Sequence, residues 1–291
     1  MIRFIVSVIG GASLGGVYAL IGLGMVLAYR ATETFNFAQG QLMLLPAFTM
    51  GYLQSKGHGN FLVQLAICLG ISAVVGLLFY VLVLQRTVGL PVFMGLIATL
   101  GIASILDAAM IMKFGANQYA IRVPGLPKGA IKILGAPIST ASLAMTGFTL
   151  LLATVMASIL RYTQLGMRIR AAGQDPVLAS QGGIQVRRLY MGSWMIAAVL
   201  AGVAGIAYGA QAFVTPSIST LGLAAVPAIM LGGLDSIEGS VIGGLAIGVL
   251  QGFTSTYLGG EYVEVVTYTL LLLLLLTYPQ GLFGTKTVTR V

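Results

Sequence analysis

Residues 271–276 read LLLLLL, within a charge-free stretch that runs from 265 to 285. Six consecutive leucines cover every face of a helix, whereas the strands of an outer-membrane barrel alternate apolar and polar residues. The stretch is also long enough for a membrane span, which needs about 20 apolar residues. It therefore predicts a transmembrane α-helix.

The rest of the chain repeats this pattern. Of its 291 residues, 58% are hydrophobic and 8% are charged, whereas about a quarter of the residues in soluble domains carry a charge. We therefore expect an all-α, polytopic transmembrane helical bundle with eight to ten spans, some broken or re-entrant, in one domain covering 1–291. Cys68 lies inside an apolar stretch and is predicted to be a small buried hydrophobe. The other charge-free stretches are 4–29, 34–55, 57–85, 87–106, 133–160, 189–234 and 240–260.

The segment RATETFNFAQGQ, residues 30–41, places amides at the entrance to an apolar run: Asn36, Gln39 and Gln41, with Gly40 among them. Each unpaired polar group is costly in such surroundings. A broken helix at membrane depth is tolerated where protein shields it or where it lines a cavity. We expect these residues to line a path for a polar solute, to which amides offer weak hydrogen bonds. The alternative is that they hydrogen-bond between helices and hold the bundle together.

Asp107, in ASILDAAMIM, is the one carboxylate that lies clearly inside a predicted span. An acid at membrane depth is by default a candidate functional residue. It precedes Lys113 by six residues and so lies near the predicted outer end of its helix. Two interpretations are open: it lines a gate in the path, or it is a satisfied structural polar group.

The loop sequence RIRAAGQDPVLASQGGI, residues 168–184, predicts a short isolated helix. Asp175 followed by Pro176 is typical of an N-cap with proline at the first helical position, and Gly182-Gly183 is typical of a helix end. Because helices of six or seven residues are marginal in water, packing against the membrane domain or another protein must hold this one.

We expect the exposed face of this helix to present small and apolar groups, Val177, Leu178 and Ala179, to a cytosolic partner. The alternative is an ordinary connector that lies on the bilayer surface. The residues assigned to the docking site are Arg168, Arg170, Gly173, Asp175, Pro176, Val177, Leu178, Ala179 and Gly183.

The basic residues predict how the chain is oriented, because cytoplasmic loops are enriched in lysine and arginine. Loop 161–189 holds five arginines and is predicted to be cytoplasmic. Nine crossings then place the N-terminus and loop 113–139 outside. The β-like runs AIRV (120–123) and AIKIL (130–134) predict a small periplasmic hairpin there. Asp235 and Glu238 are expected to cap the helix that follows them at the inner end.

Signals for enzymatic chemistry are missing from the sequence. A phosphate-binding loop needs Gly-Lys followed by Ser or Thr, and none of the lysines follows a glycine. The single histidine, His58, falls in a predicted external turn, and His, Cys and carboxylates form no cluster suited to a metal or to acid–base catalysis. We therefore expect no enzyme activity, no cofactor, no metal site and no nucleic-acid partner.

Four segments together carry a family resemblance: YRATETFNFAQGQLMLLPAF (29–48), the loop and helix beginning RAAGQDPVLASQGGI (170–184), AAVPAIMLGGLDSIEGSVIGGLAIGVLQGF (224–253) and YPQGLFG (278–284). They resemble branched-chain amino-acid ABC transporter permeases of the LivH type. The resemblance implies a multi-pass subunit of a bacterial inner-membrane importer. It also implies a second permease subunit in a heterodimer, two cytosolic ATP-binding subunits, a periplasmic substrate-binding protein, and a coupling helix at 175–183.

One departure concerns the amide segment. Where the family commonly shows His-Gly-Glu, this chain has Gln39-Gly40-Gln41, so neutral amides replace a titratable pair. Some permeases that resemble this chain transport urea, amides or aromatic acids, so the resemblance leaves the identity of the solute open. A secondary transporter driven by an ion gradient is the rival class, which would need an ion or proton site near the membrane centre.

Overall fold

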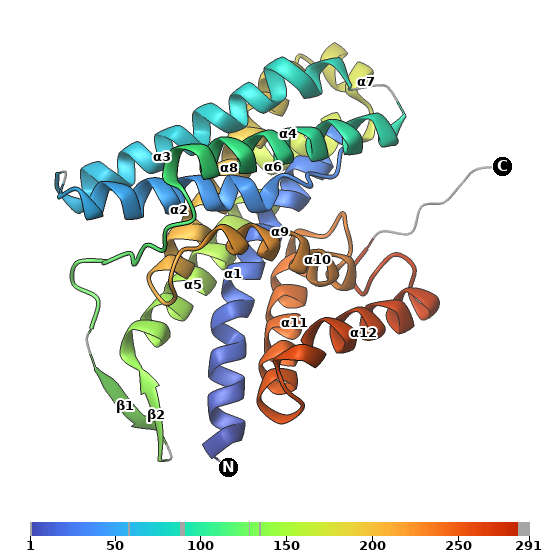
Figure 1. The fold of residues 1–291 in the computed structure, drawn as a ribbon. Helices are drawn as coiled ribbons and strands as arrows, with labels where there is room; N and C mark the ends of the chain where they lie inside the picture. The colour runs from blue at the N-terminus through green and yellow to red at the C-terminus, as the bar shows by residue number, and fades with distance from the viewer. Residues whose placement is uncertain (1, 58, 88–90, 128, 134, 285–291) are drawn as a thin grey trace.

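The computed structural model describes residues 2–57, 59–87, 91–127, 129–133 and 135–284. These residues form a helical bundle, as predicted, with a two-stranded sheet at one end (Figure 1). His58 lies outside the described residues, so its placement stays a prediction. Cys68 is fully buried, as expected.

Seven helical segments in the described part are long and apolar enough to span a membrane. The count is below the expected eight to ten because two predicted spans are shorter: α2 (Gln39–Ser55) and the apolar segment Pro216–Gly232. The seven are α1 (Ile2–Thr32), α3 continued by η1 and η2 (Phe61–Leu78, Phe79–Val83, Leu84–Arg86), α4 (Val92–Phe114), α5 (Thr140–Tyr162), α8 (Val186–Gly209), α11 (Ile237–Tyr257), and η4 continued by α12 (Gly260–Tyr262, Val263–Thr277).

Helices α1 and α11 pack at backbone distance. A Cβ atom built on Gly11 would lie 2.7 Å from the carbonyl oxygen of Gly248, and one built on Gly15 would lie 2.9 Å from the Cα of Leu245. In a bilayer, small residues allow helices to approach this closely and gain van der Waals contact. The glycine clusters at 10–16 and 243–248 therefore allow α1 and α11 to pack in direct backbone contact.

The bundle has two ends, marked by different contacts. At one end, which we call the coupling end, the C-terminal turn of α1 meets the loop before α11 through Arg30 and Asp235. This end also carries α6 (Gln164–Gln174) and α7 (Pro176–Gln181). At the other, the hairpin end, Ile2 lies against Gly135 beside the two strands. Figure 1 shows the N-terminus beside the hairpin and α7 far from both.

The hairpin differs from the predicted one in its strands. Strand β1 (Ala130–Ile133) pairs antiparallel with β2 (Ala136–Ser139), not with residues 120–123. The earlier run is held elsewhere: Tyr119 exchanges two backbone hydrogen bonds with Val214, and the side chain of Gln54 exchanges two with the backbone of Arg122. These contacts occupy the polar groups that a strand at 120–123 would need.

Two segments are broken inside the bundle. Residues 33–38 leave the helix between α1 and α2, yet Thr34 and Asn36 are buried. After α8, the chain forms η3 (Pro216–Ser219), α9 (Thr220–Ala224) and α10 (Val226–Gly232), three short pieces in place of one span. The prediction that some helices of the bundle are broken is confirmed, and the segment at 30–41 is one of them.

Candidate functional site

The α7 helix at the coupling end is capped as its sequence predicts. One carboxylate oxygen of Asp175 accepts from the backbone N–H groups of Val177 and Leu178, both at 2.9 Å. Pro176 occupies the first helical position, and Gly183, with φ of 82°, takes a left-handed conformation after the helix end. The cap satisfies N–H groups that the first turn of a helix leaves without partners.

The exposed face of α7 is narrower than predicted. Val177 and Leu178 are 65% and 63% exposed, but Ala179 is buried, so the expectation that all three point outward was wrong. Consecutive residues on an α-helix point about 100° apart, and three in a row cannot share one face. Ala179 faces the protein, and the two larger side chains are left exposed.

The α6 helix, which the sequence did not predict, joins α7 to the bundle. Ile169 and Ala172 are buried on its inner side, while Arg168 is exposed. A Cβ on Gly173 would collide with the carbonyl oxygen of Arg30. Gly173 therefore lets α6 contact the C-terminal turn of α1 directly.

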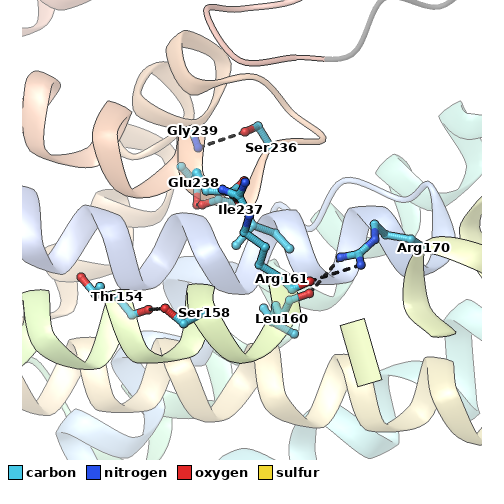
Figure 2. Close-up of polar contacts among 10 residues, drawn as sticks. Thr154, Ser158, Leu160, Arg161, Arg170, Ser236, Ile237, Glu238 and Gly239 are labelled. Carbon is cyan, nitrogen blue, oxygen red and sulfur yellow. Dashed lines mark hydrogen bonds and ion pairs between the residues drawn. The ribbon is translucent and has the colours of Figure 1, made fainter. Parts of the chain in front are cut away.

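Arg170 fastens α6 to α5. Its guanidinium donates from Nη1 to the carbonyl oxygen of Leu160 at 3.0 Å and from Nη2 to that of Arg161 at 3.3 Å (Figure 2). These carbonyls belong to the last turn of α5, where a helix has no partners of its own for them. The guanidinium of Arg170, on α6, thus caps the C-terminus of α5. Its positive charge also interacts favourably with the partial negative charge of that terminus.

An ion pair fastens α5 to α11 beside this cap. Nη1 of Arg161 lies 2.8 Å from Oε1 of Glu238, in the first turn of α11 (Figure 2). The expected cap of α11 needs correction: Ser236, not Asp235, accepts from the N–H of Gly239 at 3.0 Å. Asp235 instead accepts through its backbone carbonyl from Nε of Arg30.

Arg30 and Arg161 belong to this coupling-end cluster, and the sequence analysis did not single them out as site residues. Each stands in the last turn of a long apolar helix, Arg30 in α1 and Arg161 in α5. This position in the sequence could have identified them as site residues, because a basic side chain in the last turn of one helix can reach the first turn of a neighbouring helix.

The amides of the broken segment bond mainly to the protein. Nδ2 of Asn36 donates to Oε1 of Gln39 at 2.7 Å, and Nε2 of Gln39 donates to the carbonyl oxygen of Ala197 at 3.1 Å. Oδ1 of Asn36 accepts from the N–H of Ala38 at 3.1 Å. Both side chains are fully buried. They supply the hydrogen bonds that the interrupted backbone would otherwise lack.

Gly40 sets the distance between the two broken segments. A Cβ on Gly40 would overlap the carbonyl oxygen of Ser219, and one on Gly222 would overlap the backbone nitrogen of Gly40. The first turn of α2 and the η3–α9 junction therefore touch backbone to backbone. A side chain larger than hydrogen would separate them.

Gln41 and Asp107 form a second polar contact, between α2 and α4. Nε2 of Gln41 donates to Oδ2 of Asp107 at 2.9 Å. Oε1 of Gln41 is buried and has no hydrogen-bond partner among the described residues. The structure thus brings together two of the predicted path residues, Gln41 and Asp107, and leaves Asn36 and Gln39 in a separate network. No group of three or more His, Cys, Asp or Glu residues suited to a metal occurs in the described part.

Comparison with known proteins places this arrangement in a family. The family model described as "Branched-chain amino acid transport system / permease component" matches residues 7–275. The chain belongs to this permease family. The high-affinity branched-chain amino acid transport system permease protein LivH of Salmonella typhimurium is 29% identical over 99% of this chain and 98% of its own length. BraD of Pseudomonas aeruginosa, described in the same words, is 27% identical over the same shares.

A solved structure, PsaBC from Streptococcus pneumoniae in complex with Fab, is similar to this permease with a TM-score of 0.47. It is 13% identical and the match covers 94% of this chain and 91% of that chain. The permease is a polytopic helical membrane protein, and the family match over residues 7–275 includes both broken segments and α7.

Proposed function

We propose that this permease is a membrane subunit of an ATP-driven importer in the bacterial inner membrane and that it translocates branched-chain or related amino acids. Its partners would be a second permease subunit in a heterodimer, two cytosolic ATP-binding subunits and a periplasmic substrate-binding protein. The family match and the named relatives support the transported solute. The coupling end faces the cytoplasm, with loop 161–189, and loop 113–139 faces the periplasm.

The observation that carries this proposal is the exposed apolar pair on α7. A six-residue helix, capped by Asp175, leaves Val177 and Leu178 exposed at the coupling end. Exposed apolar surface at a fixed position is typical of a protein contact site. We assign it to a groove on an ATP-binding subunit, which supplies the nucleotide chemistry that this chain does not.

Movement of α7 would reach the long helices through named contacts. Gly173 brings α6 against α1, Arg170 ties it to the end of α5, and the ion pair of Arg161 continues to α11. A displacement of α7 therefore pulls on three spanning helices together. Such rigid-body coupling needs discrete packed contacts of this kind.

The path for the solute lies along the broken segments in this proposal. Gln41 and Asp107 line it, whereas Asn36 and Gln39 hold the segment before α2 in shape and Gly40 keeps the junction with η3 tight. Weak contacts suit a permease, because a solute must leave the site as readily as it enters.

The experiment is reconstitution of the permease with the partner subunits encoded beside it, followed by ATP-dependent uptake of labelled leucine into proteoliposomes. Leu178→Asp should abolish uptake and leave the permease folded. Ile131→Asp is the matched control, because Ile131 is 52% exposed on β1 at the opposite end. Normal uptake by the Leu178 variant would contradict the role of α7. Uptake that does not depend on ATP and is abolished by an uncoupler would instead identify an ion-driven transporter.

A further inference from the structure

The contact between Gln41 and Asp107 contains more acceptors than donors. Gln41 uses Nε2 to donate to one carboxylate oxygen of Asp107 at 2.9 Å. Its own Oε1 is buried and accepts nothing from the described residues. A buried acceptor without a donor lowers the stability of the folded protein. Its presence in a membrane helix therefore needs an explanation.

The obvious cation on the same helix does not fill the gap. The ammonium of Lys113 lies 5.6 Å from the centre of the Phe114 ring. The ion pair found among the described residues joins Arg161 to Glu238 at the coupling end, far from Asp107 in sequence and on other helices. The side-chain partner of Asp107 among the described residues is therefore the amide N–H of Gln41.

Resting on the proposed function, we infer that Gln41 and Asp107 form the permease's acceptor site for the ammonium group of the transported amino acid. The carboxylate supplies the charge, and Oε1 of Gln41 supplies a second acceptor beside it. An ammonium has three N–H donors and no acceptor, which complements the unused acceptor. The site stands seven residues before the end of α4, about 10 Å along the helix at 1.5 Å per residue.

The side-chain chemistry offers a test that separates charge from structure. In Asp107→Asn, the new amide can accept from Nε2 of Gln41 and donate to its unpaired Oε1. The variant thus keeps the hydrogen bond between α2 and α4 and adds a partner for Oε1 of Gln41. It removes the carboxylate and changes nothing else in the contact. In Gln41→Glu with Asp107→Asn, acid and amide exchange helices while the summed side-chain length stays the same.

The experiment measures leucine uptake, ATP hydrolysis stimulated by the loaded binding protein, and melting temperature, all in the reconstituted complex. Asp107→Asn should lower uptake at least tenfold, with stimulated ATPase activity retained and an equal or higher melting temperature. The exchanged double variant should recover at least half of the uptake. Wild-type uptake by Asp107→Asn, or a lower melting temperature that explains its loss, would overturn the inference.

A binding measurement addresses the ammonium itself. In nanodiscs without the binding protein, millimolar leucine should raise the melting temperature of the wild-type complex more than 4-methylpentanoate, which lacks the ammonium, and Asp107→Asn should remove the difference. Equal shifts by the two compounds in the wild type would overturn the assignment. Absence of ATP-dependent leucine uptake in the wild type would instead be a failure of the proposed function.

Discussion

The carboxylate of Glu238, in the first turn of α11, lies 2.8 Å from the guanidinium of Arg161, in the last turn of α5. Each charge also stands at the helix terminus whose partial charge it complements, since anions favour a helix N-terminus and cations a C-terminus. The pair therefore combines a direct contact between two spanning helices with two separate interactions along their axes.

This combination predicts an incomplete rescue in the charge exchange. Arg161→Glu and Glu238→Arg each place like charges together and should lower stability. The double variant regains the ion pair, worth about 0.2–1 kcal/mol at such exposure, but now opposes both helix termini. Melting temperatures in detergent should rank wild type above the double variant and the double variant above both singles. Full recovery in the double variant would show that the termini contribute nothing.

Arg170 is predicted to matter through the geometry of its fork. Lysine keeps the charge but cannot donate to two carbonyls in a fixed plane, so Arg170→Lys should lose part of the attachment of α6 and Arg170→Ala all of it. Amide hydrogen exchange in α6 should quicken in that order. Arg168→Ala is the control, because Arg168 is exposed on the same helix and, among the described residues, hydrogen-bonds Gln164 at 3.5 Å. Equal exchange in all three variants would contradict the capping role.

Local chemistry explains what the sequence predicted correctly. The cap at Asp175, the proline after it and the glycines that end α7 act within one short stretch of chain, so the helix could be read from residues in a row. The amides at 36–41 likewise mark a break, because polar groups gather where a membrane helix is interrupted.

The errors came from contacts between distant segments. Residues 120–123 have strand-like composition, but the side chain of Gln54 bonds the backbone of Arg122, and the N–H of Ile121 donates to Gly209 at the end of α8. The attachment of Arg170 to Leu160 and the contact of Gln41 with Asp107 require the relative placement of two helices, which periodicity does not give. Burial of Ala179 was the exception, since helical geometry alone forbade the expected face.

Gly40 is predicted to reject any side chain. In Gly40→Ala, the added methyl would overlap the carbonyl oxygen of Ser219, and overpacking of this kind costs about 1–3 kcal/mol. Gly101→Ala is the matched control on α4, because a Cβ at Gly101 meets nothing within 4 Å; alanine there should be neutral or stabilise by about 0.4–1 kcal/mol. Thermal unfolding in detergent measures both. A Gly40 variant as stable as the Gly101 variant would show that the two broken segments can separate freely.

The cap of α7 is predicted to control docking rather than global stability. Asp175→Ala removes the acceptor for two N–H groups at 2.9 Å, a loss of about 0.5–2 kcal/mol that acts on a helix of only six residues. The helix should fray, and affinity for the ATP-binding subunits should fall while the melting temperature changes little. Asp175→Ser, which retains a capping oxygen, should restore most of the affinity. Pull-down of the ATP-binding subunits by each variant measures this affinity. Unchanged binding by Asp175→Ala would show that α7 is a connector and not a docking helix.

Gln39 is predicted to be irreplaceable by an apolar residue of similar size. Gln39→Leu removes both the acceptor for Asn36 and the donor to Ala197 in a fully buried place, and each buried group left unpaired costs about 1–3 kcal/mol. Asn36→Leu combined with Gln39→Leu should destabilise by less than the sum of the singles, because the donor of Asn36 is then absent as well. The sole tryptophan, Trp194, donates to Thr32 at 3.3 Å near the start of the broken segment, so its fluorescence during thermal unfolding follows this region. Strict additivity of the two substitutions would show that the amides do not form one network.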